Sequence, residues 1–294
     1  VYTNEVNLRL PASLNKAVSL CSGKYIARMD ADDICLPYRL EKQYDFMEKH
    51  RDVSLSSCRF ITLKNGVYAS GGAGGRCDNN ALRAMLLVSN PILHPGVIAR
   101  ADVMRDLNYD ETLTCTEDIE LWTIIAMENK KMQILPECLL IYRLHGKQIT
   151  STTLERQHTE VLKVQQKYYA SLLEKMSGEM QEFYISGIYF REHADVHKFL
   201  AYAKWLKKAA VRNFDKQDIN YVLLEMIAEY KRHGVPKADI LRAMLMFNPL
   251  FLAKEMIRRK RTAKKDIEKC IKAALKTNLK QTGGTKVFPI FEKG

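Results

Sequence analysis

Three carboxylates stand within four residues of one another near the start of this 294-residue chain. They are Asp30, Asp32 and Asp33, and they follow a short, largely apolar stretch for which we predict a strand over 24–29. Carboxylates this close repel one another, and a cation held among them relieves that repulsion. Mg²⁺ and other hard divalent ions take carboxylate oxygens together with substrate phosphates. The spacing therefore indicates a metal–diphosphate site at the end of a strand, where open α/β sheets hold their ligands.

The same acids are also typical of a turn that leads into a helix. Aspartates favour turns and helix N-caps. Pro37 and the amphipathic stretch after it predict a helix over 37–50. On these residues alone, a metal site and ordinary turn chemistry remain equal alternatives.

A second group of acids, Glu117 and Asp118, follows Thr116, a residue that favours the N-cap position. Acids in a first helical turn complement the helix dipole, and taken alone the pattern favours this simpler interpretation. The chemical alternative is a carboxylate held at a helix start beside a cleft, where it acts as a general base. His94 lies between prolines in a shaped loop, and such a histidine is more often structural than catalytic.

We predict an α/β fold for the first 150 residues. Helices are expected over 11–20, 37–50, 79–87 and from Thr116, and strands over 24–29, 53–63 and 139–144. Asn65-Gly66 predicts a hairpin turn. The glycine-rich stretch at 71–75 lacks a P-loop lysine, so a mobile loop near the site is favoured over a phosphate cradle.

The character of the chain changes at about residue 151. Glycine and proline become sparse, and helical periodicity predicts helices over 155–176, 178–193, 195–211, 217–233, 237–247 and 250–276. The first 150 residues are electrically balanced, so the whole net charge of +12 lies in the rest of the chain. This asymmetry predicts two regions with different partners, which we divide into domains 1–150 and 151–294.

The most basic stretch lies near the end of the chain. Residues 254–280 hold eleven lysines and arginines against three acids, and Phe247, Leu250 and Phe251 stand just before them. Three interpretations are open: binding of 247–280 to an anionic membrane surface, a solvated charged face, or nucleic-acid binding, which is the least expected. No apolar stretch approaches the ~20 residues of a transmembrane helix.

The cysteines and the first residues bear on the setting of the protein. Seven cysteines form no Cys-x-x-Cys pair and are odd in number, so we predict reduced thiols in a cytoplasmic protein. Neither a zinc site nor a disulfide framework is expected. The chain begins with Val1 and without a signal-peptide pattern, so we expect its natural N-terminus to lie upstream.

Several phrases occur in one order along the first 150 residues. Asn7 and Ser13-Leu14-Asn15 are followed by GKYIARMDADD at 23–33, PYRLEKQ at 37–43, HPGV at 94–97 with Arg100, YDE at 109–111, EDIELW at 117–122 and YRLH at 142–145. This pattern closely resembles the family 2 glycosyltransferases with a GT-A fold, especially bacterial enzymes that build surface polysaccharides. The acidic phrase is specific, and the order of the shorter phrases strengthens it.

The resemblance implies a fold and a reaction. We expect a GT-A, Rossmann-like nucleotide-sugar domain that is truncated at its N-terminus, followed by a mostly α-helical region. We expect an inverting, metal-dependent transfer of a sugar from a nucleotide-diphosphate donor, UDP- or GDP-linked, to a hydroxyl of a saccharide or lipid-linked acceptor. The implied cofactor is Mn²⁺ or Mg²⁺.

The resemblance also implies roles for the matching residues. Asp30 and Asp32 would bind the metal and the donor diphosphate, with Asp33 assisting, and Asp118 would be the general base beside Glu117. The remaining contacts are expected from Arg28, Arg143 and His145 on the donor side and from His94 and Trp122 on the acceptor side.

Two departures from the family pattern leave rival hypotheses open. Family members usually begin with nucleoside-binding strand–helix–strand elements, and roughly 60–80 residues are therefore expected to be missing before Val1. Ile124 stands where the family often has an arginine that contacts substrate. A non-catalytic scaffold with a degenerate GT-A domain, whose basic helical region docks on membrane or another protein, is the main alternative. A nucleotidyltransferase is the third.

Overall fold

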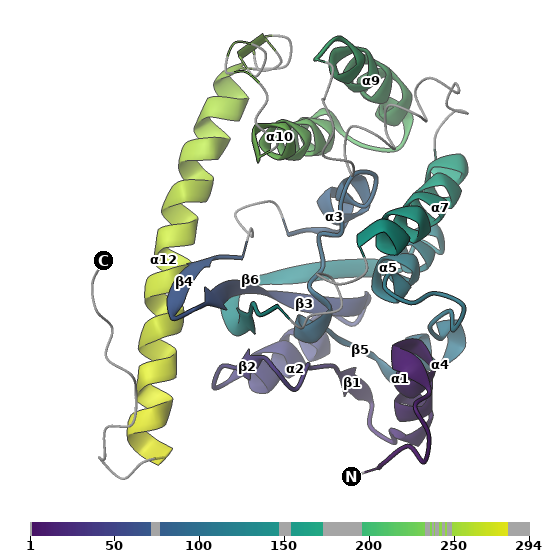
Figure 1. The fold of residues 1–294 in the computed structure, drawn as a ribbon, viewed down its shortest axis with the longest axis vertical. Coiled ribbons are helices and arrows are strands. Elements are labelled where there is room, and N and C mark those ends of the chain that lie inside the picture. Colours follow the sequence, from purple (N-terminus) through teal and green to yellow (C-terminus); the bar gives the residue numbers. More distant parts are fainter. Residues whose placement is uncertain are drawn as a thin grey trace.

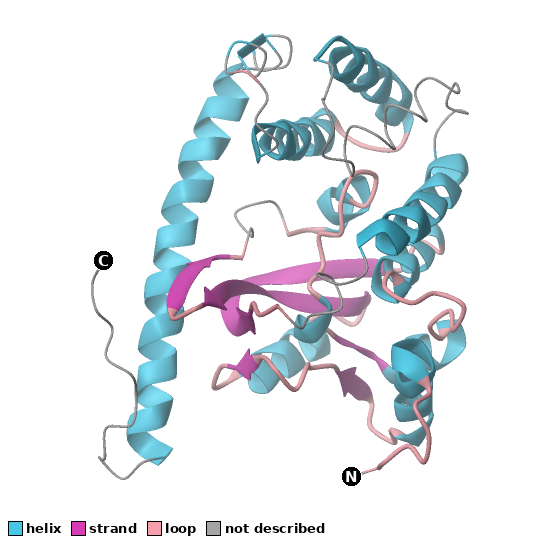
Figure 2. Cartoon of the chain, in the orientation of Figure 1, coloured by secondary structure: helices cyan, strands magenta, loops and turns pink. Residues whose placement is uncertain are grey.

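The computed structural model describes residues 2–71, 77–146, 154–172, 196–232 and 249–281, with a few single residues between 236 and 245. Figure 1 shows a sheet at the centre with helices packed around it, and Figure 2 separates the strands from the helices. The predicted helix at 178–193, most of that at 237–247 and most of the glycine-rich stretch lie outside the described residues.

One mixed sheet of six strands organises the described residues. The strands are β1 (Tyr25–Ala27), β2 (Ile34–Cys35), β3 (Val53–Lys64), β4 (Val67–Ser70), β5 (Ile98–Arg100) and β6 (Lys131–Arg143). Their order is β1-β5-β3-β6-β2, with β4 paired to β3, and only β3 and β6 run parallel. The α/β prediction is confirmed, although β1 is shorter and β6 longer than the sequence indicated.

The helices cover the sheet and extend beyond it. They are α1 (Arg9–Leu20), α2 (Arg39–Lys49), α3 (Asn79–Met85), α4 (Ala101–Leu107), α5 (Glu117–Met127), α7 (Leu154–Leu172), α9 (Val196–Ala209), α10 (Lys216–Arg232) and α12 (Pro249–Gln281), with short 3-10 turns η1 (His94–Gly96) and η3 (Ala210–Arg212). The predicted hairpin is present: Asn65 and Gly66 both have positive φ, as a tight turn between β3 and β4 requires.

The apolar core is continuous across residue 150. Leu55 and Met132 of the sheet belong to the same buried cluster as Trp122 of α5 and Tyr168 of α7. The change in composition at residue 150 therefore does not coincide with a break in the core. The division of the chain into domains 1–150 and 151–294 stays a prediction.

The long helix α12 runs along one side of the sheet beside β4 (Figure 1). Its Cys270 is fully buried and forms a disulfide with Cys138 of β6, with their Cα atoms 6.2 Å apart. The prediction of reduced thiols is wrong for this pair, because 132 residues separate the two cysteines and no sequence spacing reveals the contact. Cys21, Cys35, Cys58, Cys77 and Cys115 are free.

The hydropathy of the helices gives one further result. Among the residues that the structure describes, no helix is both long enough and apolar enough to cross a bilayer.

We expect the disulfide to stabilise the docking of α12. Replacing Cys138 by alanine should lower the free energy of unfolding of the oxidised protein by about 2–4 kcal/mol, because the unfolded chain regains the freedom of a long loop. Chemical denaturation with and without reductant measures this, and the reductant should remove most of the difference. Cys21→Ala is the matched control. Peptide mapping that finds Cys138 and Cys270 alkylated without reduction would contradict the pairing.

Candidate functional site

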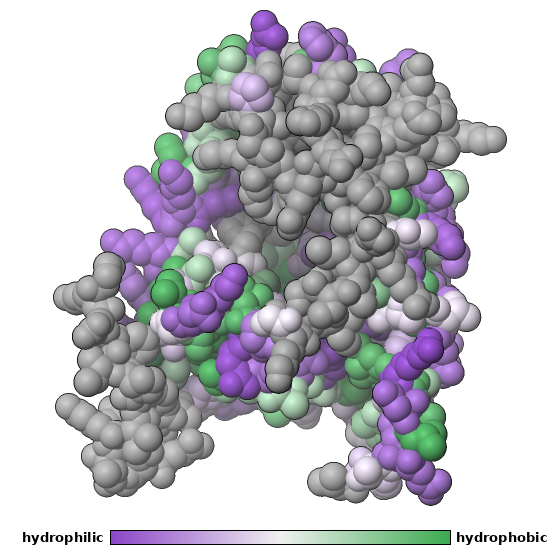
Figure 3. Space-filling view, viewed as in Figure 1, coloured by the Kyte–Doolittle hydropathy of each residue, from purple (hydrophilic) through white to green (hydrophobic). Residues whose placement is uncertain are grey.

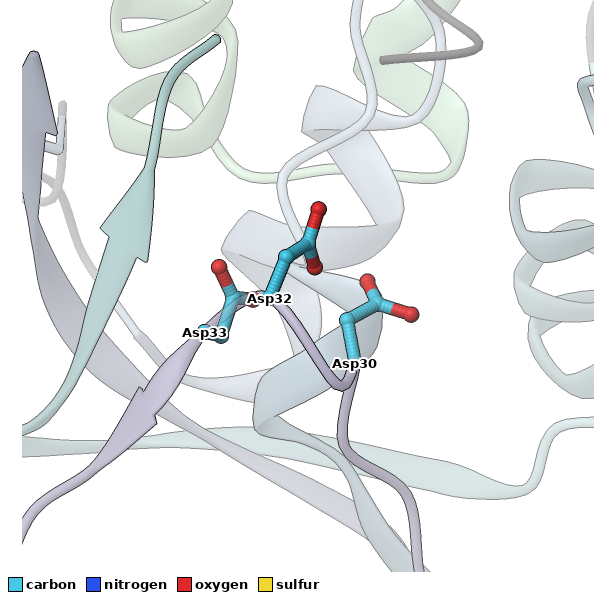
Figure 4. A group of neighbouring side chains, drawn as sticks. All are labelled: Asp30, Asp32 and Asp33. Carbon is cyan, nitrogen blue, oxygen red and sulfur yellow. The ribbon is translucent and has the colours of Figure 1, made fainter. Parts of the chain in front are cut away.

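The three predicted metal-ligating acids lie on one loop that crosses the end of the sheet. The loop leaves β1 at one edge and enters β2 at the opposite edge, and the backbone N–H of Asp33 donates to the carbonyl of Asp30 at 3.3 Å. Ligand oxygens of Asp30, Asp32 and Asp33 lie within 4.8 Å of one another. Figure 4 shows the three carboxylates on the same side of the loop. The sequence spacing therefore does produce one carboxylate cluster.

Asp30 is held by a neighbouring arginine. Two nitrogens of the Arg28 guanidinium reach the two carboxylate oxygens of Asp30, at 2.8 and 2.6 Å. The backbone carbonyl of Arg28 accepts a hydrogen bond from Arg39 of α2, so the arginine is fixed from both ends. Burial raises the pKa of Asp30, while the charge of Arg28 opposes that rise. Arg28, predicted to contact the donor, is thus engaged with the acidic loop.

The surroundings of Asp33 show whether the carboxylate cluster is suited to a metal ion. One of its oxygens accepts a hydrogen bond from the backbone N–H of Arg143 at 3.0 Å. Its other oxygen is buried and has no hydrogen-bond partner among the described residues. Burial raises the pKa of Asp33 to about 6. A buried carboxylate oxygen without a donor, in a cluster of three acids, fits a hard divalent ion such as Mg²⁺ or Mn²⁺.

Asp32 meets the end of β6, because β2 pairs with that strand. The Nε2 atom of His145 lies 2.8 Å from a carboxylate oxygen of Asp32, and Arg143 donates to the backbone carbonyl of Asp32. The hydrogen bond from His145 lowers the pKa of Asp32. The structure therefore brings both predicted residues from the YRLH phrase to the acidic loop.

The second predicted pair of acids opens α5, as the sequence indicated. Asp118 is partly buried, and its two oxygens accept hydrogen bonds at 2.7 Å from the Asn90 side chain and from the backbone N–H of Ile119. Burial raises the pKa of Asp118. Burial together with the charge of Asp118 raises the pKa of Glu117 to about 7. One Glu117 oxygen is buried without a hydrogen-bond partner among the described residues.

His94 and Trp122, predicted to contact the acceptor, lie inside the protein. His94 is buried beneath Glu117, with its Nδ1 atom 3.7 Å from a Glu117 oxygen and its Nε2 atom 2.9 Å from the Tyr109 hydroxyl. Trp122 is fully buried and meets the His94 ring edge-on. Burial lowers the pKa of His94 well below its usual value, so the ring is neutral. This geometry favours a packing role beneath Glu117 for both rings.

One guanidinium acts on both groups of acids. The charge of Arg28 lowers the pKa of Asp30 in the loop, and it also lowers the pKa values of Glu117 and Asp118 at the start of α5. The contacts agree with this, because the backbone N–H of Arg28 donates to the carbonyl of Val97 at 2.9 Å, and His94, three residues before Val97, lies 3.7 Å from Glu117.

Glu160 of α7 is a functional candidate that sequence reasoning missed. Its carboxylate accepts four hydrogen bonds from the turn before α5: from the N–H and hydroxyl of Thr114 at 3.0 and 2.8 Å, from the N–H of Cys115 at 3.2 Å and from the hydroxyl of Thr116 at 3.1 Å. Thr116 occupies the predicted N-cap position, but its hydroxyl donates to Glu160 rather than capping the helix. No local pattern predicts a contact across more than forty residues.

The sequence of this chain is similar to those of known glycosyltransferases. Residues 1–102 match the family model described as Glycosyl transferase family 2. The chain is 30% identical over 188 residues to an uncharacterized glycosyltransferase of Methanocaldococcus jannaschii, covering 64% of this chain and 62% of that protein. It is 34% identical over 157 residues to the O-antigen biosynthesis glycosyltransferase WbnJ of Escherichia coli. That match covers 52% of this chain and 60% of WbnJ.

A similar solved structure is that of TarS from S. aureus in complex with UDP-GlcNAc. Its TM-score is 0.48 at 14% identity, covering 83% of this chain and 72% of that one. The chain spans about three fifths of the length of the curated relatives named above. Its first third, which contains the acidic loop, is thus similar in sequence to family 2 glycosyltransferases.

The raised pKa of Glu117 predicts a pH-dependent cost to folding. The unfolded chain ionises this group above its usual 4.5, whereas the folded protein keeps the proton until about 7, so stability falls as the pH rises through that window. Glu117→Gln cannot ionise, and above the window it should be more stable than the parent by roughly 2–3 kcal/mol. Urea unfolding at pH values below and above the window measures the difference, with the exposed Glu41→Gln as control. An equal effect at both pH values would contradict the shift.

We expect Glu160 to position the start of α5. Glu160→Gln keeps the shape of the side chain but removes its charge, which should cost about 1.5–3 kcal/mol because charge-assisted hydrogen bonds are lost. Hydrogen exchange at residues 114–118 should quicken, whereas the exposed Glu137→Gln should leave it unchanged. Unaltered protection of these amides in the Glu160 variant would show that the turn holds without it.

Proposed function

We propose that this chain is an inverting, metal-dependent glycosyltransferase with a GT-A fold, which moves a sugar from a nucleotide-diphosphate donor to an acceptor hydroxyl. The observation that carries this proposal is the cluster of three carboxylates in the acidic loop, whose ligand oxygens have the spacing of a divalent-metal site. A second group of carboxylates, Glu117 and Asp118, stands at the start of α5. Similarity to family 2 glycosyltransferases supports the reaction class.

The acidic loop would hold the donor end of the reaction. Asp30, Asp32 and Asp33 would hold Mn²⁺ or Mg²⁺, and such an ion, when bound, neutralises the charge of the departing nucleoside diphosphate. Arg143 and His145 are exposed beside Asp32 and add positive charge next to the phosphates. We extend the proposal to a UDP- or GDP-sugar donor.

The acids at the start of α5 would act on the acceptor hydroxyl. The acceptor oxygen attacks the anomeric carbon, the bond from that carbon to the diphosphate oxygen breaks, and the hydroxyl proton passes to the carboxylate of Asp118. Burial raises the pKa of Asp118, which makes its carboxylate a better proton acceptor. The charge of Asp118 in turn raises the pKa of Glu117, because adjacent carboxylates repel each other when both are ionised. A single in-line displacement inverts the anomeric centre.

The class of acceptor follows from the relatives rather than from the site. We propose a saccharide or lipid-linked saccharide acceptor in polysaccharide synthesis, since one relative is named as an O-antigen biosynthesis glycosyltransferase.

Substitution of the two clusters separates donor binding from transfer. Asp118→Asn should reduce the turnover of sugar transfer by 10²–10⁴-fold, on the order expected for loss of a general base, while donor-induced thermal stabilisation with Mn²⁺ is retained. Asp32→Ala should abolish that metal-dependent stabilisation. The exposed Asp106→Asn is the matched control, and the natural full-length protein is screened with UDP- and GDP-sugars.

The results with these variants distinguish a catalytic glycosyltransferase from a non-catalytic scaffold protein. Transfer that survives in Asp118→Asn would refute the assignment of the base. A protein that binds no nucleotide sugar with any divalent ion, while the parent remains folded, would favour the non-catalytic alternative.

A further inference from the structure

Helix α12 has one face that is fixed to the rest of the protein. Leu252, Glu255, Asp266 and Cys270 are buried on this face, at 1%, 5%, 9% and 0% exposure. Successive members of this set are three, eleven and four residues apart, and these spacings place them on a single side of the helix. The structure therefore determines which side of the basic helix packs inward, which the sequence left open.

Several contacts of different kinds hold this inner face. Arg259 pairs with Glu225 of α10 at 2.7 Å, and Asp266 lies 3.7 Å from Arg59 of β3. Cys270 is joined to Cys138 of β6. Two of the three acids of the basic stretch, Glu255 and Asp266, are thus buried and paired within the protein. They leave little negative charge for the opposite face.

The opposite face of α12 is a continuous basic surface, which we call the outer face. Its exposed cations include Lys254, Lys260, Arg261, Lys264, Lys265 and Lys272. None of these six forms an ion pair with any acid that the structure describes. Glu268 is the one exposed acid among the side chains of α12 that the structure describes. The described side chains of the outer face therefore carry a net positive charge.

Two large apolar side chains share this face. Leu250 is 74% exposed and Ile257 is 53% exposed, and Lys264 continues their seven-residue spacing. Figure 3 shows hydrophilic side chains projecting from the outer edge of the molecule at α12, with hydrophobic ones beside them. Leu250 and Ile257 lie in line among the basic residues of one helix face, and helices that lie in a membrane interface combine basic and apolar residues in this way.

We propose that the outer face of α12 docks on an anionic lipid bilayer. Lysine and arginine side chains would contact lipid headgroups, and Leu250 and Ile257 would enter the boundary with the acyl chains. The helix is about 50 Å long at 1.5 Å per residue, which gives it an extended contact line. The partner is a bilayer rather than nucleic acid, because the apolar pair gains free energy in lipid and none from a phosphate backbone.

Docking on this face would also orient the candidate active site. The inner face near Cys270 packs in one apolar cluster with Leu36, Ile61 and Ile141. Leu36 lies only three residues after Asp33, directly after the strand β2 that leaves the acidic loop. A helix lying on a bilayer would therefore hold the acidic loop at a fixed height and angle above the lipid.

Vesicle sedimentation tests the proposal with the complete chain. We expect binding to phosphatidylcholine vesicles that contain phosphatidylglycerol, little binding to phosphatidylcholine alone, and weakening at high salt. The triple variant Arg261→Gln, Lys264→Gln, Lys265→Gln should lower the partition coefficient on the order of 100-fold, since each cation contributes about fivefold. The matched triple Lys16→Gln, Lys49→Gln, Arg51→Gln should bind as the parent does.

Ile257→Ser separates a bilayer from other anionic partners. It should weaken vesicle binding several-fold and leave binding to duplex DNA unchanged. Absence of binding to anionic vesicles, equal loss in the two triple variants, or no effect of Ile257→Ser on vesicle binding would each overturn the proposal. The readout involves no sugar transfer, so its failure leaves the proposed transferase untouched, and failure of the transferase leaves vesicle binding as it is.

Discussion

The crowding of three carboxylates in the loop between β1 and β2 is the constraint on which much of the candidate site depends. Like charges at this spacing are costly unless positive charge or hydrogen-bond donors face them. The fold provides Arg28 at one end of the loop and the end of β6 at the other. The pairing of β2 with β6 also places Arg143 and His145 beside Asp32 and Asp33.

Local elements could be predicted well, because their signals are local. The helices at α1, α2 and α5, the strand β3 and the Asn65-Gly66 hairpin follow from periodicity, capping and turn chemistry. The order of the strands could not be predicted, since pairing depends on contacts between distant residues. The disulfide between Cys138 and Cys270 was missed for the same reason, and it corrects the prediction of reduced thiols.

The residues of the candidate site also divide into those with a local sequence signal and those without one. Asp30, Asp32 and Asp33 are neighbours in sequence, so their cluster could be predicted from spacing, and the resemblance added Arg143 and His145. Glu160 could not be found, because its partners at 114–116 lie on another part of the chain. Its contact has a structural meaning: the helical region after residue 150 holds the turn from which Glu117 and Asp118 project. The two halves of the chain are therefore joined at the turn before α5, although their compositions differ.

The two carboxylate clusters differ in the side chains that contact them. In the acidic loop, the guanidinium of Arg28 reaches both oxygens of Asp30, and the ring of His145 meets Asp32. On α5, a Glu117 oxygen lies 3.7 Å from the His94 ring, and Asp118 accepts hydrogen bonds from the uncharged Asn90 side chain and the backbone N–H of Ile119. Burial raises the pKa of a carboxylate in both places, at Asp33 in the loop and at Glu117 on α5, so the direct contacts of Arg28 and His145 rather than burial distinguish the two clusters. The charge of Arg28 opposes that rise at both Glu117 and Asp118.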